Sequence, residues 1–253
     1  MHINTSAIIQ CRMGSSRLPG KVMEDIMGYP LLWHVISRVK RARSLDNVIV
    51  ATTQSSIDNV IADYCIDNSV TCFRGDEDDV LDRFYKASLD YNVETIVRVT
   101  GDCPLIDSDI IDHMVDFYNN GNFDYVTNTL PCTYPDGLDI SVFSFSSLEQ
   151  SWRHARLQSE REHVIPYIRN HPELFKIGSV TNTEDLSHLR WTVDEQTDLE
   201  FVRRICQNFN DIYFGMQEII DLLKIKPELI EINKGISRNE GYAKSLKNDR
   251  LIK

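Results

Sequence analysis

Long hydrophobic runs are missing from this 253-residue sequence, and none approaches the roughly 20 residues that a membrane-spanning helix needs. The first residues also lack the charged and apolar regions of a signal peptide. The six cysteines include no C-x-x-C pair and no zinc-ligand spacing, which favours reduced packing residues over a disulfide framework or a metal centre. These absences predict a cytoplasmic protein without a membrane partner.

Positive charge is also scarce, with 27 Lys and Arg against 38 Asp and Glu and a net charge of −11. A chain this acidic lacks the basic surface that neutralises a phosphate backbone, so we expect no nucleic-acid partner. Both common phosphate-binding motifs, GxxxxGK[ST] and GxGxxG, are missing. The composition, 42% hydrophobic and 26% charged, is typical of one large globular domain.

Strand and helix patterns alternate along the first half of the chain. Short apolar runs predict strands, and apolar residues three or four apart predict helices. The strands are expected at 7–10, 47–52, 70–73 and 94–100, and the helices at 30–42, 57–68, 80–91 and 110–118. This order predicts an α/β fold with a mostly parallel central sheet and helices on both faces.

The second half is less regular. We expect strands at 124–127, 139–143 and 189–193, and helices at 146–156, 158–169, 197–209 and 216–223. Residues 227–253 are polar and weakly periodic. We therefore predict one domain over 1–226, followed by a C-terminal extension, 227–253, that packs on this domain or on a partner subunit.

A basic loop, CRMGSSRLPGK, follows the first strand over residues 11–21. Arg12, Arg17 and Lys21 would repel one another unless an anion lay among them, and the small residues between them let the backbone bend around it. Ligands of open α/β sheets bind at the carboxyl ends of strands, where this loop lies. The pattern favours a triphosphate held by guanidinium and ammonium groups, although a solvated surface loop stays possible.

Two aspartates are expected at the same edge of the sheet. Asp102 follows the strand 94–100, and Asp194 follows the strand 189–193. Mg²⁺ takes few protein oxygens and keeps phosphate and water as its other ligands, so the pair suits a metal–triphosphate site. The alternative is that each aspartate caps a helix or a turn. Arg98, in a mostly buried strand, needs a ligand or a carboxylate as its partner.

Six segments resemble the cytidylyltransferases of the spore-coat polysaccharide type, which are relatives of 3-deoxy-manno-octulosonate and acylneuraminate cytidylyltransferases. The segments are IIQCRMGSSRLPGKVM, VRVTGDCPLID, TYPDGLDISVF, EREHVIPYI, RWTVD…DLE and NEGYAKSL, in order over nearly the whole chain. The resemblance implies a Rossmann-like nucleotidyltransferase domain. It also implies Mg²⁺-dependent transfer of CMP from CTP to an acidic sugar, with pyrophosphate released for surface polysaccharide or glycan synthesis, by a homodimer.

The resemblance also implies roles for individual residues. Arg12, Lys21, Asp102 and Asp194 are the expected catalytic residues, with Asp102 and Asp194 as the metal ligands. The expected CTP-binding residues are Arg12, Gly14, Ser15, Arg17, Lys21, Arg74, Gly75, Asp82, Arg83 and Arg98. The expected acceptor-binding residues are Asn128, Tyr134, Asp136, Asp139, Arg161 and His163.

Two positions depart from the family pattern. Cys11 stands where relatives usually have an alanine, and Ser141 stands where a glutamate is expected in GLDxEVF. If that glutamate contacts the acceptor, the acceptor differs here.

Three other functions stay open. The first is a cytidylyltransferase for a phosphorylated alditol or sugar, which would need extra cations such as Arg153, Arg156 and Arg161. The second is a glycosyltransferase that consumes a nucleotide sugar through a metal-binding D-x-D motif. The sequence Asp107-Ser108-Asp109 has this pattern but is better explained as a helix cap. The third is a non-catalytic nucleotide-binding module, which has no need of both aspartates.

Overall fold

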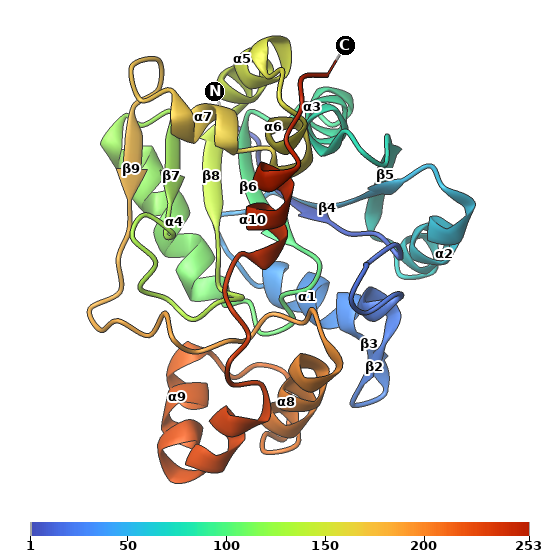
Figure 1. Cartoon of the computed structure of the whole chain (residues 1–253), viewed down its shortest axis with the longest axis vertical. Coiled ribbons are helices and arrows are strands. Elements are labelled where there is room, and N and C mark those ends of the chain that lie inside the picture. The colour runs from blue at the N-terminus through green and yellow to red at the C-terminus, as the bar shows by residue number, and fades with distance from the viewer. Residues whose placement is uncertain (1, 253) are drawn as a thin grey trace.

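The computed structural model describes residues 2–252, and in this part of the chain a seven-stranded sheet forms the centre (Figure 1). Its order is β5-β4-β1-β6-β8-β7-β9, and β8 runs antiparallel to both of its neighbours. The strands are β1 (Thr5–Gln10), β4 (Asn47–Thr53), β5 (Thr71–Gly75), β6 (Thr95–Thr100), β7 (Tyr125–Thr127), β8 (Ser141–Ser144) and β9 (Ile177–Ser179). This mostly parallel sheet confirms the predicted fold class.

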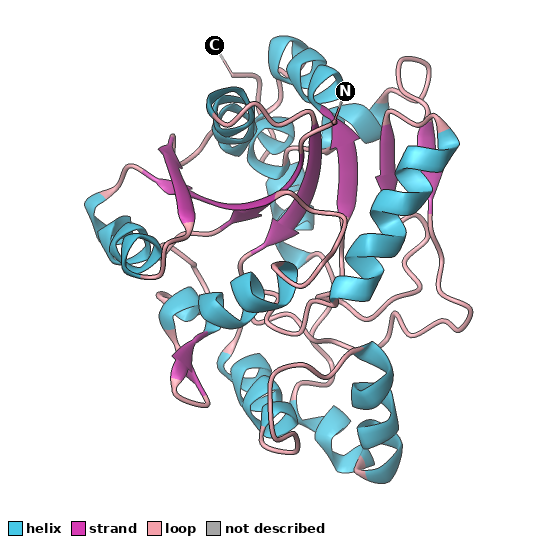
Figure 2. Ribbon diagram, turned by 180° about the vertical axis from the view of Figure 1, so that it is seen from behind, coloured by secondary structure: helices cyan, strands magenta, loops and turns pink. Residues whose placement is uncertain are grey.

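Helices cover both faces because the strands are apolar on both sides. In β1, Ala7 and Ile9 pack into one hydrophobic core and Ile8 into another, since successive side chains point to opposite faces. The first core contains residues of α1 (Leu31–Val39), α2 (Asn59–Asp67) and α4 (Ser108–Gly121). The second contains residues of α3 (Val80–Asp90), α5 (Phe145–His154) and α7 (Pro166–Asn170); Figures 1 and 2 show the two sides.

The remaining elements lie around this three-layered body. A short hairpin joins β2 (Asp25–Ile26) to β3 (Tyr29–Pro30). A lower layer in Figure 1 contains α8 (Gln196–Cys206), α9 (Met216–Ile225) and the 3₁₀ helix η3 (Pro227–Ile232). The other elements are η1 (Lys21–Met23), η2 (Ser56–Asp58), α6 (Gln158–His163) and α10 (Glu240–Lys247). No helix in residues 2–252 has both the length and the apolar character needed to cross a membrane.

Two predicted elements are wrong. Residues 189–193 form no strand; this buried, extended segment instead hydrogen-bonds to loops, with the Val193 amide donating to the Asp102 carbonyl at 2.8 Å. The predicted helix 158–169 is two helices, α6 and α7. Val164 between them has a φ of 70°, and Pro166 cannot donate the backbone hydrogen bond that a continuous helix needs.

The D-x-D sequence caps a helix, as predicted. The Asp107 carboxylate accepts hydrogen bonds from the backbone amides of Asp109 and Ile110, at 2.8 and 3.4 Å, at the start of α4. Its second oxygen accepts from the Met216 amide at 2.7 Å. Both oxygens of Asp107 are thus used to join two helix N-termini, which argues against a metal-binding role for this D-x-D sequence.

Candidate active site

The basic loop and both predicted aspartates meet at one edge of the sheet. Lys21 Nζ donates to Asp102 Oδ2 at 2.7 Å, to Asp194 Oδ1 at 2.9 Å and to the Val193 carbonyl at 2.7 Å. The two carboxylates, 92 residues apart in sequence, therefore lie on either side of one ammonium group. The parallel arrangement of β1 and β6 explains the meeting, because the loop after β1 and Asp102 after β6 leave the sheet at the same edge.

Lys21 and Asp102 shift each other's pKa. Burial disfavours the charged form of Asp102, but the adjacent Lys21 outweighs burial and lowers the Asp102 pKa to about 2. Burial likewise disfavours the Lys21 cation, and the two aspartates outweigh it and raise the Lys21 pKa. Asp102 and Lys21 are consequently both charged at neutral pH, and the position between the two carboxylates is occupied by the Lys21 ammonium.

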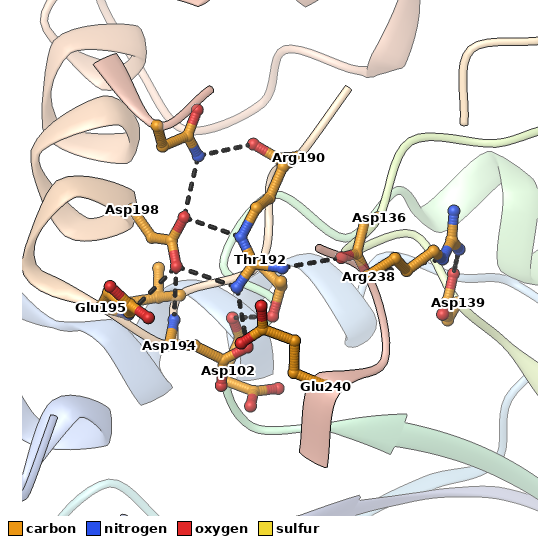
Figure 3. Close-up of polar contacts among 12 residues, drawn as sticks. Asp102, Asp136, Asp139, Arg190, Thr192, Asp194, Glu195, Asp198, Arg238 and Glu240 are labelled. Atoms are coloured by element: carbon orange, nitrogen blue, oxygen red, sulfur yellow. Dashed lines mark hydrogen bonds and ion pairs between the residues drawn. The ribbon is translucent and has the colours of Figure 1, made fainter. Parts of the chain in front are cut away.

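Arg190 holds Asp194 from the other side, and sequence reasoning missed it (Figure 3). Its guanidinium donates to Asp194 Oδ2 at 2.8 Å, to Asp136 Oδ2 at 2.9 Å and to both oxygens of Asp198 at 2.9 and 3.0 Å. Asp198 is fully buried and also accepts from the backbone amides of Asp194 and Glu195. One signal was available: an arginine within an apolar stretch, four residues before Asp194.

Two cavities open on either side of the aspartates. The first has a volume of about 340 Å³ and the second about 310 Å³. Both are lined by the same five residues at their junction: Arg17, Thr100, Asp102, His163 and Asp194. The arrangement can hold two ligands that meet at the carboxylate pair.

Most of the predicted CTP-binding residues line the first cavity, namely Arg12, Gly14, Ser15, Arg17, Lys21 and Arg83. Arg98 lines the second cavity instead. Arg74, Gly75 and Asp82 line neither. Arg74 donates to the carbonyls of Thr53 and Ser55, both at 2.8 Å, and Asp82 accepts from Trp152 Nε1 at 2.9 Å.

The predicted acceptor-binding residues are divided in the same way. Asp136, Asp139 and His163 line the second cavity, whereas Asn128, Tyr134 and Arg161 line neither. Asn128 is buried, and its amide joins the Leu138 carbonyl and the Ile140 amide at 2.7 and 2.9 Å. Tyr134 packs in the hydrophobic core. Arg161 donates to both oxygens of Asp79, which caps α3.

The C-terminal segment contributes to the second cavity, and sequence reasoning did not place it there. Arg238 pairs with Asp139 and donates to the Tyr134 carbonyl at 3.0 Å, and Glu240 pairs with Arg17 at 3.3 Å. In α10, Ser245 Oγ lies 2.9 Å from His163 Nε2.

Figure 1 shows α10 in front of the sheet, over β6 and β8. Residues 238–245 thus contact the body of this same chain.

Asp136 is expected to make stability depend on pH. Burial, reinforced by the Asp139 carboxylate, raises the Asp136 pKa to about 6, although Arg238 and Arg190 oppose this. Between about pH 4 and pH 6 the folded state holds a proton that the unfolded state has released, so stability falls as pH rises through this range. The loss should be up to about 3 kcal/mol.

In Asp136→Asn this loss of stability between pH 4 and pH 7 should be smaller, and urea unfolding at the two pH values will measure it. Asp63→Asn, a change at an exposed aspartate, is the matched control. The same pH dependence in Asp136→Asn as in the unsubstituted protein would contradict the assignment.

Comparison with known proteins identifies the family of this chain. The family model described as "Cytidylyltransferase" matches residues 6–220. An uncharacterized protein of Methanocaldococcus jannaschii is 39% identical over 237 residues, covering 93% of this chain and 96% of that protein. The spore coat polysaccharide biosynthesis protein SpsF of Bacillus subtilis is 32% identical over 231 residues, covering 87% and 94%.

A solved structure and a more distant relative agree. The structure of a cytidylyltransferase from Leptospira borgpetersenii superposes with a TM-score of 0.88 at 37% identity, covering 94% of this chain and 100% of that one. The 3-deoxy-manno-octulosonate cytidylyltransferase of Geobacter sulfurreducens is 35% identical over 113 residues, covering 45% of this chain and 44% of that protein. The chain therefore belongs to the cytidylyltransferase family.

Proposed function

We propose that this protein transfers CMP from CTP to an acidic sugar and releases pyrophosphate. The observation that carries the proposal is the position of Asp102 and Asp194 at the junction of two cavities. The first cavity has the basic loop suited to a triphosphate, and the second has room for an acceptor. Family membership supports the cytidylyltransferase chemistry, and the partial match to a 3-deoxy-manno-octulosonate enzyme favours an acidic acceptor.

In the proposed reaction an acceptor hydroxyl oxygen attacks the α-phosphorus, and the bond from that phosphorus to the pyrophosphate oxygen breaks. Arg12 and Arg17 bind the triphosphate and neutralise charge that grows on the leaving pyrophosphate. Lys21 and Arg190 hold the two carboxylates in place at the junction. Much of the rate enhancement then comes from bringing the two substrates together in a fixed orientation.

Mg²⁺ fits this site. Asp102 and Asp194 bring hard oxygen donors to the junction of the two cavities, and Lys21 Nζ contacts only one oxygen of each, Asp102 Oδ2 and Asp194 Oδ1. Residues 2–252 contain no group of three or more His, Cys, Asp or Glu suited to a metal. Two carboxylates suffice, since Mg²⁺ completes its ligands with phosphate and water. When bound, Mg²⁺ would polarise the α-phosphate and lower the pKa of the acceptor hydroxyl.

Nucleotide choice tests the proposal. A pocket shaped for a pyrimidine rejects purines by size and by leaving its polar groups unpaired, so CTP should bind more than about tenfold more tightly than ATP or GTP. Isothermal titration with the four nucleotides measures this preference. Pyrophosphate release from CTP should then require an acidic sugar, whereas tighter binding of ATP than of CTP would overturn the proposal.

A further inference from the structure

Arg98 enters the second cavity without an ionic partner. It lies in the middle of β6, and its neighbour across the sheet is Ser141 of β8. Its Nε donates to Gln10 Oε1 at 2.9 Å, yet within residues 2–252 no carboxylate forms an ion pair with it. Ser141, only 4% exposed, offers a hydroxyl that lies 3.2 Å from the Tyr125 hydroxyl. Burial lowers the Arg98 pKa, which reflects the cost of keeping this cation out of water.

Arg169 of α7 lines the same cavity. Its guanidinium makes no hydrogen bond or ion pair with any residue in the described part of the chain. It is half-buried and approaches the cavity from the helix layer, whereas Arg98 approaches from the sheet. Two arginines from different layers thus reach one cavity, and neither forms an ion pair within residues 2–252.

The carboxylates of this cavity form ion pairs with cations other than Arg98 and Arg169. Of the four arginines that line it, Arg17 pairs with Asp194 and Glu240, and Arg190 with Asp136, Asp194 and Asp198. The remaining carboxylates have partners too, since Asp102 pairs with Lys21 and Asp139 with Arg238. No carboxylate of the cavity therefore forms an ion pair with Arg98 or Arg169, and a partly buried cation is stabilised when an anion becomes its partner.

We propose that Arg98 and Arg169 form an anion subsite that binds the carboxylate or phosphate group of the acceptor. The inference rests on the proposed function, which places the acceptor in this cavity. Guanidinium groups suit an oxyanion because each can donate two parallel hydrogen bonds. The arginines suggested by sequence for a phosphorylated acceptor lie elsewhere: Arg153 pairs with Glu149 at 2.8 Å, and Arg161 pairs with Asp79.

Binding of four probes will test the subsite by isothermal titration in EDTA, with CTP absent. The probes are 3-deoxy-manno-octulosonate and N-acetylneuraminate, which carry a carboxylate, ribitol 5-phosphate, and neutral ribitol. Arg98→Gln and Arg169→Gln should each weaken binding of an anionic probe by about tenfold or more and leave ribitol unchanged. Arg153→Gln, at an exposed arginine, is the matched control and should bind like the unsubstituted protein.

A third variant introduces the opposite charge. Ser141→Glu places a carboxylate across from Arg98 and should produce the same loss without removing an arginine. If circular dichroism shows that Arg98→Gln or Ser141→Glu fails to fold, the test of the subsite rests on Arg169→Gln, a change at a half-buried position of α7. Preference for the carboxylate probes over ribitol 5-phosphate, or the reverse, identifies which anion the subsite takes.

The outcomes separate this inference from the proposed function. The subsite is wrong if no anionic probe binds the unsubstituted protein, or if Arg169→Gln binds them as tightly. If the acid and CTP both bind but no pyrophosphate is released, the proposed function fails while the subsite stands.

Discussion

Asp102→Asn and Asp194→Asn are each expected to reduce turnover on the order of 10³-fold. Both carboxylates accept a hydrogen bond from Lys21 Nζ, and both line the two cavities. Each therefore contributes to the same junction between CTP and acceptor. Loss of either leaves that junction unable to hold the α-phosphate beside the acceptor hydroxyl. Because residues that act as one unit are strongly non-additive, the double variant should be little worse than the worse single variant.

Initial rates of pyrophosphate release, measured over a range of Mg²⁺ and Mn²⁺ concentrations, will check this expectation. Higher metal concentrations should partly restore the single variants, and CTP should still bind in EDTA through Arg12 and Arg17. Asp109→Asn, in the helix-capping D-x-D sequence, is the matched control and should keep full turnover. Multiplying effects of the two substitutions, or near-native turnover in either variant, would refute a shared site.

Lys21→Met should lower turnover on the order of 10²-fold and also destabilise the protein without metal. Methionine keeps most of the side-chain volume but leaves Asp102 and Asp194 without the cation between them. Lys21 is largely buried, with a side chain 9% exposed, and breaking a buried ion pair costs about 3 kcal/mol. A divalent cation could replace the lost charge, so Mg²⁺ should raise the Tm of Lys21→Met by more than it raises that of the unsubstituted protein.

Thermal unfolding with Mg²⁺ and with EDTA measures this difference independently of activity. Lys86→Met removes an exposed lysine that pairs with Asp82, and should change neither turnover nor the response to Mg²⁺. An equal Mg²⁺ response in Lys21→Met and the unsubstituted protein would contradict the expected replacement of the ammonium by a divalent cation.

Local sequence patterns determined the α/β fold and part of the site. Apolar strands such as β1 and β6 are encoded by neighbouring residues, and in a parallel sheet the ends of such strands must meet at one edge. This is why the basic loop and Asp102 could be predicted to lie together. The cap at Asp107 was predictable for the same reason, because capping depends on residues one to three positions away.

Tertiary structure alone decided which charges pair. Arg190 contacts Asp136, 54 residues away, and Arg238 contacts Asp139, 99 residues away, and no local periodicity encodes such partners. The segment 189–193 has the composition of a strand, yet hydrogen bonds to loops hold it outside the sheet. Arg98 was expected among the CTP-binding residues, but it lines the second cavity. The physical reason is that side-chain pairing depends on the packed positions of distant elements, whereas secondary structure depends mainly on neighbours in sequence.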